Sequence, residues 1–287
     1  MKAAPRWELV RSGEYEAVAK FLARREPECV AACSRFLQMR GGSVRGARDK
    51  TWVIRNSAGE IESLLLYSRR SLLPVLDGKR HIPAPRFLRS FLSRPLIYAV
   101  QGTKGDDAIL ESILVKCGYS VSERIDYDLM GLDGQPDAQC FRLGPSGLVI
   151  RRPEKKDLDE LFTLQSAYEQ EEVLPGKAVF NPAVSRANLG HIFNNERMLL
   201  SCLNGRIVGK INTSASSFSR YQIGGVYVRP EYRGMGIAGR MAAVFVKGLV
   251  DEGRGVTLFV KKSNPPARAV YRRLGFSIQG DYRITYY

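Results

Sequence analysis

An arginine and two closely spaced glycines stand where a strand-like run meets a helix-like one. The stretch 226–239 reads VYVRPEYRGMGIAG, and Arg233, Gly234 and Gly236 follow its apolar start. The first backbone N–H groups of a helix have no intrahelical partner, and the helix dipole adds partial positive charge there. Glycine lets an anion approach the backbone closely, and arginine adds donors suited to phosphate. The stretch therefore predicts an anion-binding turn, although plain turns of this composition are also common.

Two nucleotide-binding motifs do not describe this turn. A P-loop would end in Gly-Lys followed by Ser or Thr, and that ending is absent. Glycines at 234, 236 and 239 do have the spacing of the dinucleotide fingerprint, but the next strand-like run, VTLFVKK at 256–262, ends in two lysines. The fingerprint requires an acidic residue near that place. A nicotinamide-dinucleotide site is therefore not predicted.

A second pattern lies further along the chain, where Asn264, Ala267, Tyr271, Gly275 and Phe276 read N-x-x-A-x-x-x-Y-x-x-x-G-F. Together with the turn RGMGIA, which reads as Q/R-x-x-G-x-G/A, this pattern resembles the GNAT superfamily of acetyl-CoA-dependent N-acetyltransferases. The two motifs occur in the family's order, and the resemblance covers about residues 146–287. It implies the GNAT acyltransferase fold for this part of the chain, which is a mixed α/β fold.

The resemblance also implies acetyl-CoA as the cofactor. Backbone N–H groups from Gly234 to Gly239 would bind its pyrophosphate. The strand edge at Val226, Tyr227 and Val228 would pair with the pantetheine arm, where this strand splays from its neighbour. The other implied cofactor contacts lie in the turn, at the helix start and in the second motif: Arg233, Met235, Gly236, Ile237, Ala238, Asn264, Ala267 and Tyr271.

The resemblance implies a catalytic role for Tyr271, whose hydroxyl would protonate the leaving sulfur, although the residue also suits a core position. The acceptor amine must lose a proton, so a base is needed. Near the place where the family often has glutamate, this sequence has Gln222, which cannot act as a base. Glu171 and Glu172 are therefore candidates to bind a cationic acceptor or to take its proton. A solvated acidic face is the plainer interpretation of these two residues.

The chain of 287 residues is long enough for two domains. Glycine and proline are frequent in 131–147, which predicts a linker. We place the boundary between 143 and 144, so that 1–143 form an N-terminal domain and 144–287 the catalytic domain. In the latter, strand-like and helix-like runs alternate, and Asn204-Gly205 predicts a hairpin.

The N-terminal domain is interpreted as a degenerate copy of the same fold. Both halves contain a helix-like run, a Gly-aromatic pair and then a strand-like run. If Gly118 is aligned with Gly275, Leu114 takes the place of the motif's tyrosine and Asp107 that of its asparagine. The segment 72–92, which should hold the glycine turn, lacks the motif. We expect no acetyl-CoA site in this half.

The net charge of +15 suits an acidic partner, such as a phosphate-rich cofactor, nucleic acid or an acidic protein. Residues 35–95 are rich in arginine and lysine, with Trp52, Phe87 and Phe91 among them. This composition would suit an RNA-binding face. A solvated basic surface is the plainer interpretation, so a nucleic-acid partner is not predicted.

Five cysteines are scattered along the chain, and no histidine or acidic cluster accompanies them, so we predict free thiols and no metal site. No apolar run reaches the roughly 18–20 residues that span a bilayer. The N-terminus lacks the apolar core of a signal peptide. We therefore expect a cytoplasmic protein without a membrane partner.

The function predicted from these features is transfer of an acetyl group from acetyl-CoA to a primary amine by direct attack. The alternative is a non-catalytic module that senses acyl-CoA or binds RNA and keeps only the cofactor site. Both motifs favour the enzyme, whereas the missing base keeps the alternative open. The acceptor is not predicted: a polyamine, an amino acid, an antibiotic, or an amine of a protein would each fit.

Overall fold

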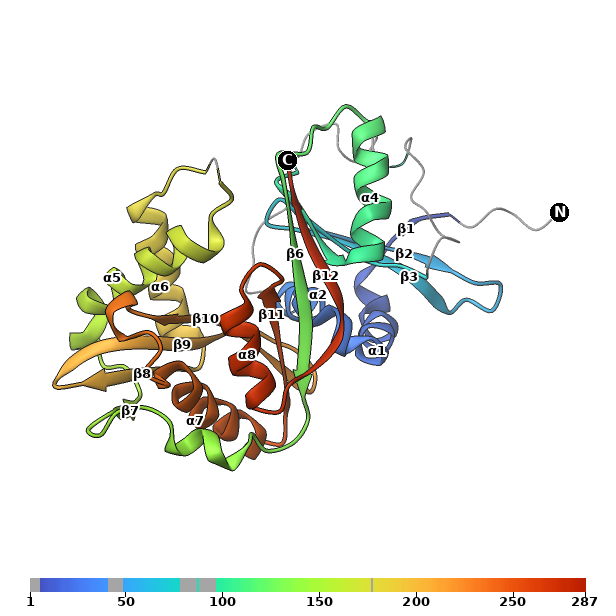
Figure 1. Cartoon of the computed structure of the whole chain (residues 1–287). Coiled ribbons are helices and arrows are strands. Elements are labelled where there is room, and N and C mark those ends of the chain that lie inside the picture. The colour runs from blue at the N-terminus through green and yellow to red at the C-terminus, as the bar shows by residue number, and fades with distance from the viewer. Residues whose placement is uncertain (1–5, 41–48, 78–86, 88–96, 177) are drawn as a thin grey trace. The chain divides into compact units, whose positions relative to one another are not determined.

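The computed structural model describes residues 6–40, 49–77, 87, 97–176 and 178–287 (Figure 1). The chain forms two compact units, one ending at Leu129 and completed by Gln279–Tyr287, the other spanning Met130–Ile278. The end of the chain thus belongs to the first unit. The domain boundary that the sequence predicts at 143/144 stays a proposal.

The second unit is a mixed sheet covered by helices, as the sequence predicts. Its strands pair in the order β11-β10-β9-β8-β7, with β7 to β10 antiparallel and β10 parallel to β11. These strands are β7 Val149–Arg151, β8 Met198–Leu203, β9 Arg206–Ser216, β10 Arg220–Val228 and β11 Gly255–Lys261. The helices and helical turns are η3 Ala138–Arg142, η4 Lys155–Asp157, α5 Leu158–Tyr168, the π-helical turn η5 Glu169–Val173, α6 Pro182–Asn195, η6 Pro230–Tyr232, α7 Ile237–Asp251 and α8 Pro265–Arg273.

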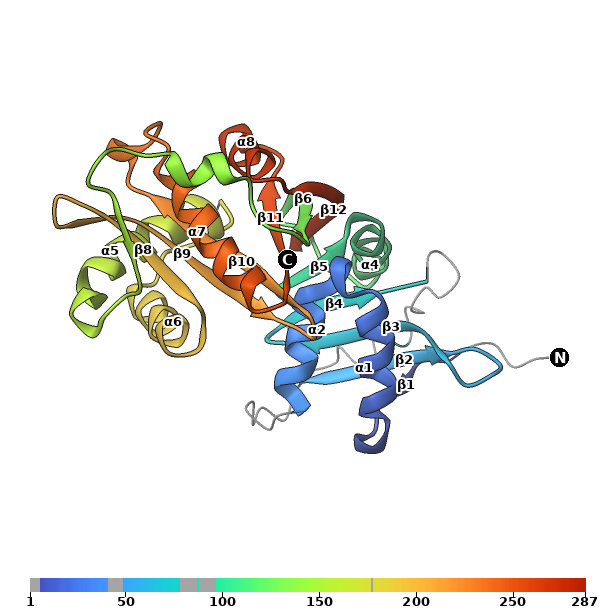
Figure 2. The ribbon, with the colours of Figure 1, turned by 90° about the horizontal axis from the view of Figure 1, so that it is seen from below.

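Helices cover both faces of this sheet (Figure 2). The apolar stripe of α7 packs on one face, and α5 and α6 pack on the other. Tyr227 and Val228 are neighbours in β10 but belong to different core clusters, as the two-residue period of a strand requires. The predicted hairpin is confirmed: Asn204 and Gly205 join β8 to β9 with φ of 50° and 78°, the positive values that a tight hairpin turn needs.

The first unit also combines a mixed sheet with helices. Its strands pair in the order β1-β2-β3-β4-β5-β12, with β4 parallel to β5. The strand β12, last in the chain, completes this sheet by antiparallel pairing with β5. The elements are β1 Glu8–Leu9, η1 Ser12–Glu14, α1 Tyr15–Arg24, α2 Glu26–Arg40, β2 Lys50–Arg55, β3 Ile61–Ser68, β4 Ser71–Val75, β5 Ala99–Thr103, α4 Lys104–Lys116, β6 Glu123–Leu132 and β12 Ser277–Tyr286.

Element order repeats along the chain. A strand, two helices, three strands, a further strand, a helix and a strand occur from β1 to β6, and the same series, with α7 inserted, occurs from β7 to β12. The counterpart of α7 would fall within 76–98, which lies mostly outside the described residues. One detail of the sequence alignment is wrong. Helix α4 is longer than α8, so its N-cap is Thr103, and Asp107 does not occupy the position equivalent to Asn264.

Among the described residues, no helix combines the length and the apolar character that crossing a membrane requires. Within the same residues, no group of three or more histidine, cysteine or acidic side chains is arranged to hold a metal ion. Cys29 and Cys33 are buried free thiols whose sulfurs lie 3.7 Å apart.

Asp107 makes the stability of the first unit depend on pH. The side chain is fully buried, and its Oδ1 accepts a hydrogen bond of 2.7 Å from Thr285 Oγ1. In the part of the chain that the structure describes, its Oδ2 has no hydrogen-bond partner. Burial raises the pKa of Asp107 to about 7. The folded protein therefore binds the proton of Asp107 more tightly than the unfolded chain does. The stability that comes from this tighter proton binding is lost as the pH rises through about 7.

We expect Asp107→Asn to stabilise the protein at pH 8, on the order of 2 kcal/mol, and to have little effect at pH 4. Thermal unfolding at the two pH values measures the difference. Asp126→Asn is the control, because the hydrogen bond from Arg283 lowers the pKa of Asp126 to about 2, and its carboxylate is charged at both pH values. The control should lose stability at both. An effect of Asp107→Asn that does not change with pH would contradict the account.

Candidate functional site

Strands β10 and β11 separate halfway along their length. Arg220–Ile223 lie opposite Gly255–Leu258 in parallel register. Further along, Gly224 lies opposite Asn212 on β9 but Tyr227 lies opposite Lys210, so β10 contains one extra residue. Such a bulge bends the strand that contains it. The splay that the family resemblance implied for this strand is therefore present.

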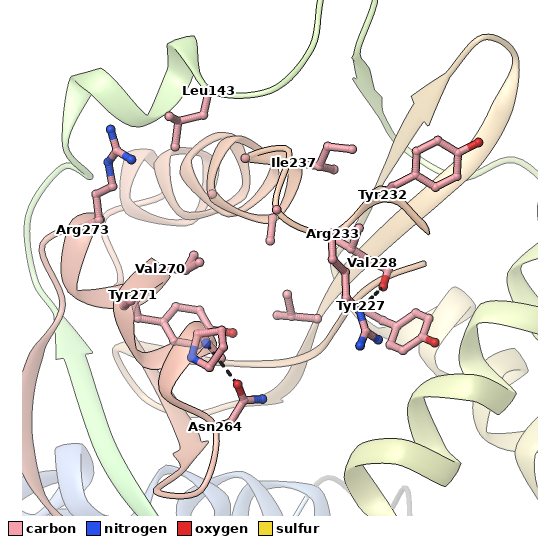
Figure 3. Close-up of a pocket in the computed structure, with 18 of the residues that line it drawn as sticks. Leu143, Tyr227, Val228, Tyr232, Arg233, Ile237, Asn264, Val270, Tyr271 and Arg273 are labelled. Carbon is pink, nitrogen blue, oxygen red and sulfur yellow. Dashed lines mark hydrogen bonds between the residues drawn. The ribbon is translucent and has the colours of Figure 1, made fainter. Parts of the chain in front are cut away.

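A cavity of about 530 Å³, called here the interstrand cavity, lies between the end of β10, the start of α7 and the helix α8 (Figure 3). Most of the residues predicted to contact the cofactor line it. They are Val226, Tyr227, Val228, Arg233, Gly234, Gly236, Ile237, Ala238, Gly239, Asn264, Ala267 and Tyr271. Met235 lies in the same turn with 43% of its surface exposed and does not line the cavity.

The glycine turn gives α7 an open N-terminus at this cavity. Gly234 and Gly236 both have φ of 78°, a conformation that glycine adopts without strain. Gly236 is the N-cap of α7, and its carbonyl accepts the hydrogen bond of Arg240 N. Within the described residues, no side chain caps this helix. The N–H groups of Ile237, Ala238 and Gly239 precede the first intrahelical bond and are therefore available to an anion.

Arg233 is tied to its surroundings in this structure. Its Nη2 donates to Glu171 Oε2 at 2.8 Å, and its Nε donates to the carbonyl of Val228 at 3.0 Å. The guanidinium also lies over the ring of Tyr227, 5.3 Å from the centroid. The hydrogen bond to Glu171 raises the pKa of Arg233. The charge that the sequence predicts for phosphate binding is thus paired with a carboxylate.

Glu171 and Glu172 reach two different walls of the interstrand cavity from the turn η5. Glu171 pairs with Arg233, in the loop after β10. Glu172 Oε2 lies 3.2 Å from Lys261 Nζ at the end of β11, and its Oε1 accepts a hydrogen bond of 3.2 Å from Asn264 Nδ2. From the sequence, these carboxylates were expected to bind the acceptor or to take its proton. In the structure both line the cavity that contains the glycine turn, and each is paired with a cation.

The second motif builds a helix with a fixed start and end. Asn264 Oδ1 accepts a hydrogen bond of 3.1 Å from Ala267 N and thereby caps α8. Gly275 ends the helix with φ of 100°, and Phe276 folds back so that its ring meets that of Tyr271 edge-on at 5.9 Å. Tyr271 is 7% exposed and lines the cavity (Figure 3). Burial raises the pKa of Tyr271, so the hydroxyl keeps its proton at neutral pH.

We expect Asn264→Ala to lower the free energy of unfolding by about 1 kcal/mol, because α8 loses its cap. Asn264→Ser is the matched variant, since serine caps helices nearly as well as asparagine. Urea denaturation of both variants measures the difference. Equal stability of Asn264→Ala and the wild type would show that this cap does not hold α8.

Several residues that line the cavity were not predicted from the sequence. Val270 and Arg273 follow Ala267 at intervals of three residues, so helical periodicity could have predicted them. Cys140 and Leu143 also line the cavity, but they lie in the stretch 131–147 that the sequence analysis interpreted as a linker. That interpretation is wrong for η3, because Cys140 is fully buried in the core cluster of α7. The other lining residues that were not predicted are Tyr232, Pro266 and Ala269.

Gln222 is buried, and its amide Nε2 donates to Ser214 Oγ at 2.9 Å. Gln222 lies in β10, the strand before the glycine turn, as the sequence predicts, and its side chain supplies no base there.

The separated parallel strands, the uncapped helix and the buried tyrosine lie in one part of the chain. The model of the acetyltransferase (GNAT) family matches residues 158–276. This part of the chain is therefore a GNAT domain, as the two motifs implied.

Solved structures extend the similarity to nearly the whole chain. A Drosophila protein matches over 98% of each chain, with a TM-score of 0.65 and 13% identity. A GCN5-related N-acetyltransferase from Sphaerobacter thermophilus matches over 99% of this chain and 96% of its own, with a TM-score of 0.60 and 17% identity. A tandem GNAT protein from the clavulanic acid biosynthesis pathway matches over 98% of each chain, with a TM-score of 0.56 and 14% identity. At these identities the likeness concerns the fold alone. No curated protein matches the sequence.

Proposed function

We propose that this protein transfers the acetyl group of acetyl-CoA to a primary amine, and that the interstrand cavity is the donor site. The observation that carries the proposal is the pairing of two features in one cavity. The open N-terminus of α7 lies on one wall, and the buried hydroxyl-bearing ring of Tyr271 lies on α8 opposite (Figure 3). The first suits an anion and the second suits a leaving group that needs a proton.

The residues present fit acetyl-CoA. The cavity of about 530 Å³ falls within the range of roughly 300–1,000 Å³ common for ligand sites. The N–H groups of Gly236 to Gly239 would hold the pyrophosphate, and the edge Val226–Val228 would pair with the pantetheine arm. Arg233 and Met235 would flank the phosphates, while Asn264 and Ala267 would line the other wall. Bound there, acetyl-CoA supplies an acetyl group activated as a thioester.

Tyr271 would act as the general acid. Its Oη holds its proton at neutral pH and would give that proton to the thiolate as the C–S bond breaks and the amine forms the new C–N bond. Glu171 and Glu172 are the proposed acceptors for the proton that the amine loses, either directly or through water. Since both already contact cations, one of these ion pairs must open when a carboxylate takes that role.

We propose that 144–287 act as the catalytic domain and that 1–143 are a degenerate copy without a donor site. The repeated element order supports the copy. In the second unit the interstrand cavity lies beside the parallel pair β10–β11. Beside the equivalent pair β4–β5, the described residues of the first unit line a cavity of about 10 Å³. A Cβ at Gly102 would lie 3.2 Å from the ring of Pro74, so this space is closely packed. The segment 72–92 lies mostly outside the described residues.

Calorimetric titration tests the donor site. We expect one acetyl-CoA bound per chain, because the second repeat has the interstrand cavity and the glycine turn, whereas the sequence of the first repeat lacks the motif of that turn. Two equivalents per chain would contradict the degenerate first half, and no binding would contradict the donor site itself.

A non-catalytic module that senses acyl-CoA is the second candidate, and one observation favours it. Both carboxylates that line the interstrand cavity are ion-paired, and Gln222 supplies no base. Such a module would bind acetyl-CoA without releasing thiol in the presence of any amine. The basic stretch 35–95 that would serve RNA binding lies in part outside the described residues, and the cytoplasmic location stays a prediction from sequence.

A further inference from the structure

Lys210 is a fully buried lysine beside the bulge of β10. Its Nζ donates to the carbonyl oxygen of Gly225 at 2.9 Å and to Asn212 Oδ1 at 3.1 Å. The nitrogen also lies 4.7 Å from the centre of the Tyr168 ring. Burying an ammonium group is costly, and apolar side chains of similar size often replace buried charges without loss of stability. A lysine at this place therefore calls for a role that methionine could not fill.

The neutral form of the amine matches these surroundings. Burial lowers the pKa of Lys210 to about 7. A neutral amine has two N–H bonds, and the site presents two acceptors, Gly225 O and Asn212 Oδ1. Either protonation state can therefore hold the carbonyl of Gly225.

Gly225 is held on both sides by hydrogen bonds. Its N–H, in the peptide with Gly224, donates to Tyr168 Oη at 3.2 Å, and its carbonyl, in the peptide with Val226, accepts from Lys210. Gly225 has φ of 59°, and a Cβ there would lie 2.0 Å from Asn212 Oδ1, so only glycine fits.

The fixed carbonyl sets the direction of the next N–H group. Among the described residues every peptide bond is trans, and in a planar trans peptide the C=O and the following N–H point in opposite directions. With the carbonyl of Gly225 on Lys210, the N–H of Val226 points the other way. Val226 belongs to the opposite face of β10 from Tyr227 and lines the interstrand cavity.

We propose that Lys210 is a positioning residue, which holds the Gly225–Val226 peptide so that the N–H of Val226 donates to the acyl carbonyl oxygen in the interstrand cavity. This inference rests on the proposed function, because the carbonyl is that of acetyl-CoA. When the amine attacks, negative charge develops on that oxygen. A donor fixed in advance at this place stabilises the charge without having to reorganise.

Three lysine variants test the proposal. Lys210→Met keeps the volume and removes the donor, and its kcat should fall about 100-fold, the size of effect seen when an oxyanion donor is lost. Its KM for acetyl-CoA should stay within threefold, because the pyrophosphate site is untouched. Lys210→Gln keeps a donor and should retain more activity than Lys210→Met. Lys247→Met, at an exposed position on α7 that pairs with Asp251, is the matched control and should behave as the wild type.

A role in packing alone predicts a different outcome. Methionine fills the same space and removes a buried amine, so Lys210→Met would then be as active as the wild type. Wild-type kcat in a folded Lys210→Met protein would overturn the proposal. If that variant does not fold, Lys210→Leu removes the same donor with a different apolar side chain, and a wild-type kcat there would overturn the proposal in the same way.

A spectroscopic arm separates this inference from the proposed function. The ¹H–¹⁵N resonance of Val226 in the ligand-free protein should move in Lys210→Met and stay in Lys247→Met. An unchanged Val226 resonance would overturn the positioning role whatever the activity. If the wild-type protein releases no thiol but the Val226 resonance still moves in Lys210→Met, the proposed function is refuted. The inference that Lys210 orients the Gly225–Val226 peptide would then still stand.

Discussion

Tyr271→Phe is expected to lower kcat about 100-fold or more, the usual contribution of a general acid, and to leave acetyl-CoA binding nearly unchanged. The ring would stay in place, because it packs edge-on against Phe276 and lies in the core cluster of the second unit. The variant therefore removes the proton and little else. Steady-state kinetics gives the loss of turnover, and calorimetric titration gives the affinity for acetyl-CoA.

Tyr221→Phe is the matched control for this substitution. Tyr221 is also a buried tyrosine of the same core cluster, and its hydroxyl donates to Glu252 at 2.8 Å, outside the interstrand cavity. Its loss should lower stability and leave kcat within about twofold, since Tyr221 does not line that cavity. Turnover of Tyr271→Phe equal to that of Tyr221→Phe would remove Tyr271 from the mechanism.

Gly236→Ala is expected to weaken acetyl-CoA binding by more than about tenfold, because it strains the backbone where the N–H groups of α7 converge. The residue has φ of 78°, and a Cβ would lie 3.0 Å from Gly144 N and 3.2 Å from Leu143 Cβ. The turn or η3 must then shift, which moves the N–H groups of Ile237 and Ala238. Titration with acetyl-CoA measures the change in affinity.

Two other glycines separate backbone strain from displacement of the site. Gly234 has the same φ of 78° with open space around a Cβ, so Gly234→Ala should weaken binding less than Gly236→Ala. Gly253 has φ of 76° beyond the other end of α7, also in open space. Gly253→Ala should cost about as much stability as Gly234→Ala and leave acetyl-CoA affinity unchanged. Equal affinity of all three variants would show that α7 does not form the donor site.

The elements around the donor site could be predicted because local chemistry determines each of them. Helix α7 shows its apolar stripe in the sequence, α8 has a proline at its start and a glycine after its end, and Asn204-Gly205 marks a hairpin. The two motifs predicted most of the lining of the cavity as well. In the glycine turn and in α8, the same few residues determine the local structure and line the cavity.

Long-range pairing could not be predicted in the same way. Nothing in the composition of η3 indicates that Cys140 packs against α7, because a Gly/Pro-rich segment has no periodicity to interpret. The pairing of β12 with β5 joins distant parts of the sequence, and register depends on the partner strand. Lys210 in the strand RIVGKINTS resembles any polar residue of a half-buried strand, so its burial and its bond to Gly225 appear only in three dimensions.

The most direct test of the central claim is the release of free CoA thiol when the full chain meets acetyl-CoA and a panel of primary amines. The panel should include polyamines, amino acids, aminoglycosides and peptides with free N-termini or lysines. We predict amine-dependent thiol release with at least one class, with the acetylated amine identified by mass spectrometry, and its loss in Tyr271→Phe. Tight binding of acetyl-CoA without thiol release for any amine would contradict the transferase and favour the acyl-CoA-sensing module.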